Sequence, residues 1–129
     1  MEKIKIIALF VAVFFTSLAL AQDKSCFPES KLSDPEIEKA ILNAFNDDPK
    51  NEGEVAKRAA IISRDWEVFR DDDTNAPYRQ IISYVVYTKK DKCFYEKIRY
   101  RSEFDGKEYT KALKANGWWP AKKVTCDCK

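Results

Sequence analysis

The positions of the four cysteines place the strongest constraint on how this chain folds. Cys126 and Cys128 are separated by a single residue, and a disulfide between them would close a very small, strained ring. We therefore predict that each pairs elsewhere, one with Cys26 and one with Cys93. Two such bridges would tie the N-terminal segment and the middle of the chain to the C-terminus. We prefer them to a redox or soft-metal site at Cys126 and Cys128, because disulfides form readily in an oxidising compartment.

The first 21 residues indicate that the protein reaches such a compartment. Two lysines precede an unbroken apolar run, residues 6–15, and small residues follow at Ala19 and Ala21. This pattern is typical of a secretory signal peptide, and its apolar part is shorter than the roughly 20 residues that a membrane-spanning helix needs. We expect a secreted or periplasmic protein, with a signal peptide at residues 1–21, a single α+β domain at residues 22–129 and no membrane contact after cleavage.

The composition excludes several kinds of chemistry. The chain has no histidine, and its 23 lysine and arginine residues stand against 21 acidic residues, for a net charge of +2. Without histidine, a Ser-His-Asp triad, a Cys-His dyad and an HExxH zinc site are excluded. Because charges of both signs are interleaved, the overall charge favours neither nucleic acid nor a membrane as partner. We predict no catalytic residue, no cofactor and no metal site.

Apolar periodicity predicts one or two helices in the first half of the domain. Ser33 and Glu36 form a capping box, and apolar residues at helical spacing follow as far as Phe45. Residues 54–62 are ambiguous, because three alanines favour a second helix whereas Ile61 and Ile62 favour a strand. Both alternatives stay open at this point.

Extended segments separated by turn residues fill the second half. We expect strands within residues 63–70, 78–89, 93–103 and 122–128, the second of them central because it is apolar on both sides. Asn116-Gly117 is a strong turn signal. The predicted fold class is α+β, with one or two N-terminal helices packed on a curved antiparallel sheet of about four strands that disulfides staple together.

The third of these strands differs most clearly on its two sides. Ile98 and Tyr100 lie on the apolar side, together with Phe94 and Phe104. The other side carries aromatic and basic residues, namely Tyr95, Lys97, Arg99 and Arg101. Because side chains alternate along a strand, these four share one face. The face is either a solvated one, balanced by neighbouring acids, or a surface for an acidic ligand or partner.

Trp118 and Trp119 are a second candidate for partner contact. Successive side chains of an extended segment point to opposite faces, so both rings cannot enter one core. One of them would remain exposed and could fill a pocket on a partner. In the alternative interpretation, one ring packs over the sheet while the other covers its edge.

Two acidic clusters favour structural roles. The run Asp71-Asp72-Asp73 with Asn75 offers oxygen ligands, but it lacks the alternate acids, central glycine and distal glutamate of an EF-hand loop. We expect a solvated hairpin tip there. Asp65 and Glu67 lie on the same side of an extended segment, where burial could raise a carboxyl pKa for acid/base chemistry. Exposed charged side chains on a strand are far commoner than buried ones, so we expect no catalytic role for this pair.

The order of these elements resembles that of small secreted bacterial domains of the cystatin-like superfamily, which includes nuclear-transport-factor-like folds. The resemblance covers residues 33–104. It rests on the capped helix, on Ile62-x-x-x-Trp66-x-x-x-Arg70, and on a long hairpin with Arg79 at its entry and Lys92-Cys93 at its return. It implies a helix lying on the concave side of a curved antiparallel sheet. Fold analogy of this kind says little about function.

From these residues we expect an exported, non-catalytic binding protein, in the manner of an inhibitor or immunity-type interaction protein. Its partner would be another protein or an acidic ligand. The candidate partner-binding residues are Tyr95, Lys97, Arg99, Arg101, Trp118 and Trp119. The alternative is a small-ligand-binding or enzymatic cone-shaped domain with a pocket between helix and sheet. A filled core with exposed aromatic residues would favour the first, and an apolar pocket with an inward carboxylate would favour the second.

Overall fold

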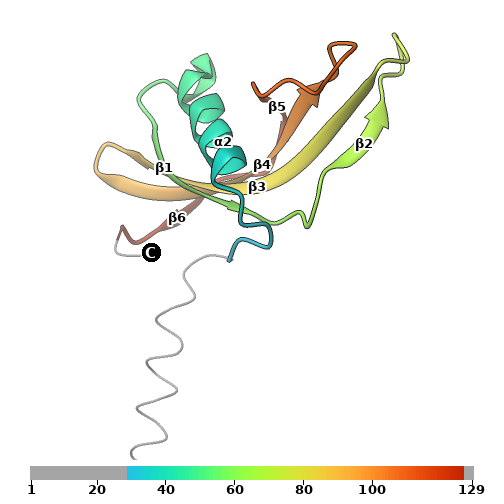
Figure 1. Cartoon of the computed structure of the whole chain (residues 1–129). Coiled ribbons are helices and arrows are strands. Elements are labelled where there is room, and N and C mark those ends of the chain that lie inside the picture. Colours follow the sequence, from blue (N-terminus) through green and yellow to red (C-terminus); the bar gives the residue numbers. More distant parts are fainter. Residues whose placement is uncertain (1–28, 127–129) are drawn as a thin grey trace, which may run out of the picture. The chain divides into compact units, whose positions relative to one another are not determined.

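The computed structural model of the protein describes residues 29–126 (Figure 1). The predicted signal peptide at residues 1–21 lies outside the described residues, as do Cys26 and Cys128. Within them the chain forms one α-helix, a short 3-10 helix and six strands. In chain order these are α2 (Pro35–Asp47), η1 (Pro49–Asn51), β1 (Val55–Ile61), β2 (Glu67–Arg70), β3 (Pro77–Lys89), β4 (Lys92–Glu103), β5 (Lys114–Trp118) and β6 (Lys122–Val124).

A long hairpin of β3 and β4 forms the centre of an antiparallel sheet. Its pairing runs from Tyr78 opposite Glu103 to Lys89 opposite Lys92. Two short strands line each outer edge: β1 and β2 pair with β3, and β5 and β6 pair with β4. The α+β class and the central place of β3 are therefore confirmed. The predicted count of about four strands is wrong, because each outer row of the sheet is divided into two strands.

The helix begins one residue later than the capping box predicted. The Asp34 side chain, not that of Ser33, accepts hydrogen bonds from the backbone N–H groups of Glu36 and Ile37, at 3.1 and 3.2 Å. Asp34 is extended and Pro35 occupies the first helical position, where its missing N–H costs nothing. The helix ends at Asp47, two residues after the last apolar position of the predicted pattern, Phe45.

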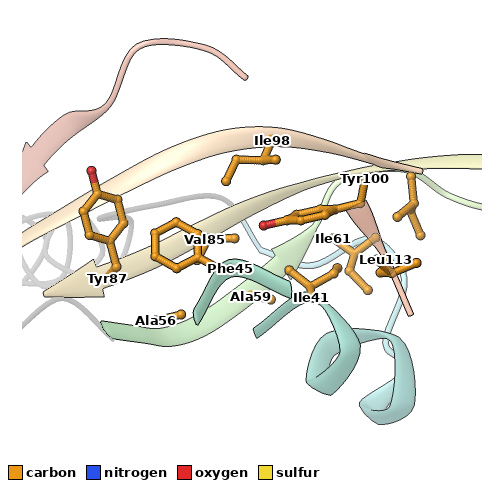
Figure 2. Packing of buried hydrophobic residues seen from close by; sticks show 11 residues of the cluster. Ile41, Phe45, Ala56, Ala59, Ile61, Val85, Tyr87, Ile98, Tyr100 and Leu113 are labelled. Carbon is orange, nitrogen blue, oxygen red and sulfur yellow. The ribbon is translucent and has the colours of Figure 1, made fainter. Parts of the chain in front are cut away.

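The core lies between α2 and one face of the sheet. Ile41 and Phe45 are 0% and 1% exposed and point from the helix toward the strands (Figure 2). The sheet and the segment before β5 supply the remaining buried residues of this cluster, which are Ala56, Ala59, Ile61, Ile81, Val85, Tyr87, Ile98, Tyr100 and Leu113. The predicted apolar face of the helix is thus confirmed, and the space between helix and sheet is filled.

The structure resolves the ambiguity of residues 54–62 in favour of a strand. Residues of β1 pair with β3 from Val55 opposite Thr88 to Ile61 opposite Ser83. Ala59, Ala60 and Ile61 are all buried. The described residues therefore contain a single α-helix. The small alanine side chains of β1 allow this strand to pack closely against it.

One strand was not predicted at all. Asn116 and Gly117, expected to form a turn, lie inside β5. Gly117 has a φ of 125°, and the pairing of β5 with β4 shifts register between Ile98 and Tyr100. The Asn-Gly pair therefore marks an irregularity within a strand, a place where glycine is also favoured. The last strand, β6, ends at Val124, short of the predicted limit.

A disulfide joins β4 to the segment after β6. It links Cys93 to Cys126, whose Cα atoms are 5.2 Å apart. This agrees with the prediction that Cys93 pairs with one of the two C-terminal cysteines, a choice that the sequence left open. The second predicted bridge, which would then join Cys26 to Cys128, lies outside the described residues and stays a prediction.

Candidate functional site

The outer face of β4, opposite the helix, carries the predicted row of basic and aromatic side chains. Lys97 lies directly opposite Tyr84 of β3, and Arg99 lies opposite Ile82. Ile98, between them, is buried on the helix side. The two-sided pattern of this strand is therefore confirmed: Tyr95, Lys97, Arg99 and Arg101 occupy one face.

Trp119 lies over two members of this row. The Lys97 Nζ is 4.3 Å from the centroid of the indole ring, and the Arg99 guanidinium carbon is 5.5 Å from it. The backbone N–H of Trp119 donates to the Lys97 carbonyl at 2.9 Å, which holds the ring in place. A cation close to an aromatic face is stabilised by the ring quadrupole. Lys97, Arg99 and Trp119 therefore form one unit, the Trp119 cluster.

Arg101 is held differently from its neighbours. Its Nη2 is 3.0 Å from Asp71 Oδ2, its Nε is 2.6 Å from Glu103 Oε1, and its guanidinium carbon is 3.6 Å from the centroid of the Tyr78 ring. Hydrogen bonds from Nη2 to Glu103 and Asp71 raise the pKa of Arg101, and the bond to Arg101 lowers the pKa of Asp71. In contrast, neither Lys97 nor Arg99 forms an ion pair with a carboxylate of residues 29–126. Of the three cations in this row, Lys97 and Arg99 are thus the two that no described carboxylate neutralises.

A shallow hollow adjoins the cluster. It has a volume of about 310 Å³ and is lined by Arg99 together with side chains of β2, β3 and the loop before β2, namely Ser63, Glu67, Phe69, Tyr78, Gln80 and Ile82. Phe69 and Tyr78 stack within it, with ring centroids 5.7 Å apart. Of these lining residues, only Arg99 was predicted from the sequence to bind a partner. Strand alternation groups Tyr78 with Gln80 and Ile82, but only the register of β3 against β4 brings them next to Arg99.

The two adjacent tryptophans lie on opposite faces, as their extended segment predicts. Trp118 contacts the helix side, where the Lys50 Nζ is 3.9 Å from the centroid of its ring, and it is 54% exposed. Trp119 lies on the outer face. Of the six predicted binding residues, Trp118 is therefore separated from the other five. Tyr95 lies toward the far end of the row and packs edge-on against Tyr84, with ring centroids 5.5 Å apart.

The helix side of the sheet has a larger opening of its own. A groove of about 1120 Å³ runs between α2 and the segment that leads into β5. Ile37, Ala40 and Ala44 line it from the helix, and Leu113 and Ala115 line it from the other wall. Leu113 is also a member of the core cluster, so the groove adjoins the core. Glu96, the half-buried acid on the helix side of β4, is not among its lining residues.

The acidic run after β2 has a structural role. Asp71 Oδ1 accepts hydrogen bonds from the backbone N–H groups of Asp73 and Thr74, and Asn75 has a positive φ of 58°. This is the hairpin tip that we expected. Across residues 29–126, no group of three or more acidic or cysteine side chains is arranged to hold a metal ion.

Comparisons with other proteins identify no relative: no family model, curated protein or solved structure matches the chain. Among residues 29–126, no helix has the length and apolar character needed to cross a membrane. The resemblance to the cystatin-like superfamily therefore stays a prediction.

Proposed function

We propose that this protein is an exported, non-catalytic binding protein that holds an acidic protein partner on the outer face of β4. One observation carries the proposal. Trp119 fixes two cations, Lys97 and Arg99, that no described carboxylate neutralises. Fixed charges lose little conformational freedom on binding, and an arginine can hold a carboxylate through two hydrogen bonds.

The hollow beside Arg99 adds a second type of contact. Phe69 is 41% exposed, and Tyr78 and Ile82 are half-buried in the same hollow. Interfaces concentrate binding energy where an aromatic or apolar anchor fills a pocket next to charged groups. A partner that presents a carboxylate to Arg99 could place an apolar side chain in this hollow.

The filled core favours binding over the alternative of an internal ligand pocket. Ile41, Phe45 and Tyr100 occupy the space between helix and sheet with at most 1% exposure. The groove beside the helix lacks Glu96, the one described acid whose pKa burial raises. An enzyme of the alternative class would need an inward carboxylate in its pocket, whereas the acids that line this groove, on the helix and the turn after it, are exposed or half-buried. Export rests on the predicted signal peptide and is supported by the Cys93–Cys126 disulfide.

The proposal is tested by reversing the two free charges. Lys97→Glu with Arg99→Glu should abolish capture of the partner from the secreted and periplasmic fractions of the native organism, because it turns attraction into repulsion. Capture by the unmodified protein should also weaken as salt is raised. The matched control, Lys90→Glu with Lys107→Glu, makes the same charge change at exposed turn positions that line neither the hollow nor the groove beside α2 and should leave capture unchanged.

Melting temperatures of both variants verify that each one is folded. A folded Lys97→Glu, Arg99→Glu protein that still captures the same partner would move the binding site off this face. We choose these two residues over Arg101 because Arg101→Glu would also break the ion pairs with Asp71 and Glu103.

A further inference from the structure

The helix side of the sheet holds an arginine with an unpaired donor. Arg79 of β3 lies directly opposite Ser102, one row beyond the buried pair Ile81 and Tyr100. Its guanidinium carbon is 4.0 Å from the centroid of a Trp66 ring and 4.7 Å from that of the Tyr109 ring. Its Nε is buried and has no hydrogen-bond partner among residues 29–126. Nor does any described carboxylate form an ion pair with it.

These contacts leave the Arg79 guanidinium able to bind an anion. Ring faces stabilise its positive charge, but the N–H groups lie in the guanidinium plane and still need acceptors. Buried donors in native proteins are almost always paired. Burial also lowers the pKa of Arg79, and the nearby Tyr109 and Asp65 oppose this as smaller effects. A carboxylate accepts two parallel N–H bonds from such a group, so it is the anion that fits best.

The segment after β4 fixes the Tyr109 ring, the second of the two rings beside Arg79, in position. Ser102 Oγ donates to the Thr110 carbonyl at 2.8 Å, and the Thr110 N–H donates to the Glu103 carbonyl at 2.8 Å. The rings of Phe104 and Tyr109 pack with their centroids 5.1 Å apart. Three separate contacts thus return this segment to the sheet beside Arg79. The site is held by the fold and does not depend on a ligand to assemble it.

Arg79, Trp66 and Tyr109 all line the large groove beside α2. The two walls of this groove differ in charge. The helix wall and the turn after it carry the carboxylates of Asp34, Glu36, Asp47 and Asp48, with Lys39 and Lys50 among them, whereas the opposite wall carries Lys111 and Lys114. At about 1120 Å³ the groove exceeds the roughly 300–1,000 Å³ of typical small-molecule pockets. An occupant with charges of both signs and an apolar body complements it.

One wall of the groove belongs to an edge strand. Lys114 and Ala115 of β5 line the groove, and β5 pairs with β4 alone among the described strands. An edge strand presents unpaired backbone groups with which an extended chain can pair. Peptide binding at a sheet edge combines such pairing with pockets for alternate side chains.

We infer that the groove binds an extended peptide segment of a partner protein and that Arg79 anchors it by holding an acidic side chain of that segment. A basic side chain of the same segment faces the carboxylates of the helix wall. The inference goes beyond the proposed function and does not rest on it, because Arg79 and the Trp119 cluster lie on opposite faces of the sheet. Either site can fail its test while the other stands.

The test follows the Arg79 Nε–H signal in a ¹H–¹⁵N spectrum, assigned by its absence from the Arg79→Lys variant. The probe is a pool of acetylated, amidated hexapeptides with glutamate fixed at the third position and the other positions varied. The control pool has glutamine there. We expect the glutamate pool to shift this signal saturably and the glutamine pool to leave it in place. Arg79→Lys keeps a charge beside the rings but loses the paired donors, so its binding of the glutamate pool, followed by the backbone amide signals of the groove residues, should weaken tenfold or more.

The melting temperature of Arg79→Lys separates a folding defect from a binding defect. If Arg79→Lys does not fold, the Arg79 Nε–H signal is assigned by triple-resonance spectra of the native chain, and the comparison of the two peptide pools still tests the inference. Equal shifts with both pools, or no shift with either, would overturn it. Sodium acetate that binds as tightly as the glutamate pool would overturn the assignment to a peptide, and a folded Arg79→Lys protein with unchanged affinity would overturn the role of Arg79.

Discussion

Glu96 is the acidic side chain whose ionisation the fold opposes. It lies on the helix side of β4, opposite the fully buried Val85. Burial raises its pKa, and the nearby Glu54 adds to the effect by repulsion. A carboxyl group with a raised pKa in the folded state favours folding while it is protonated. Its contribution is present below the unfolded-state pKa of about 4.3 and is lost as the pH rises through the folded-state value.

We therefore expect Glu96→Gln to raise the melting temperature at pH 7, because glutamine cannot ionise. The gain should shrink toward pH 4, where the native carboxyl group is increasingly protonated. Thermal unfolding at a series of pH values measures both effects. Glu52→Gln serves as the control. It removes one negative charge from an exposed side chain in the turn before β1. A Glu96→Gln variant that is no more stable at pH 7 than at pH 4, relative to the native chain, would contradict this account.

Individual residues also show where local sequence patterns were enough to predict the structure. The alternation of side chains predicted that Trp118 and Trp119 would diverge, and they do. It could not predict that the Trp119 ring would cover Lys97 and Arg99, because that contact depends on how the chain returns after β5. The prediction of the helix cap was wrong for a simpler reason. Ser33 and Asp34 are both good N-cap residues, and only the structure distinguishes them.

Among the elements, length and strong periodicity decided what could be predicted. The strands β3 and β4 have 13 and 12 residues and carry clear patterns, so both were expected nearly at their true limits. β5 has five residues and contains the Asn-Gly pair that usually signals a turn. The groove and its Arg79 site were missed for the same reason, because one wall is formed by this strand and the segment before it.

The helix gives a direct test of how the core is held. Ile41→Ala and Phe45→Ala should each reduce the free energy of unfolding by about 2–5 kcal/mol, because both remove fully buried side chains against the sheet. Lys39→Ala, on the exposed side of the same helix, should change it by less than about 0.5 kcal/mol. Chemical denaturation of the three variants measures the difference. Similar small losses at all three positions would mean that α2 does not pack on the sheet in this way.

For the whole molecule, the Cys93–Cys126 disulfide joins the C-terminal end of the described chain to the central hairpin. It closes a loop across 33 positions of sequence that includes β5 and β6. In the chain-entropy model a loop of this size stabilises a fold by roughly 3–4 kcal/mol. This is a large share of the total free energy of unfolding for a domain with one modest core. The short strand β6, with three residues, depends most on the bridge.

The predicted pairing can be read from one digest, because Asp127 separates the two C-terminal cysteines. Cleavage before aspartates, without reduction, releases Cys126 and Cys128 in different peptides. We expect peptide 91–104 to be joined to peptide 105–126, which is the disulfide of the structure, and peptide 23–33 to be joined to peptide 127–129. Mass spectrometry before and after reduction identifies both pairs. A link between peptides 23–33 and 91–104 would contradict both assignments, because it would leave the two C-terminal cysteines without the partners that the spacing of Cys126 and Cys128 led us to predict.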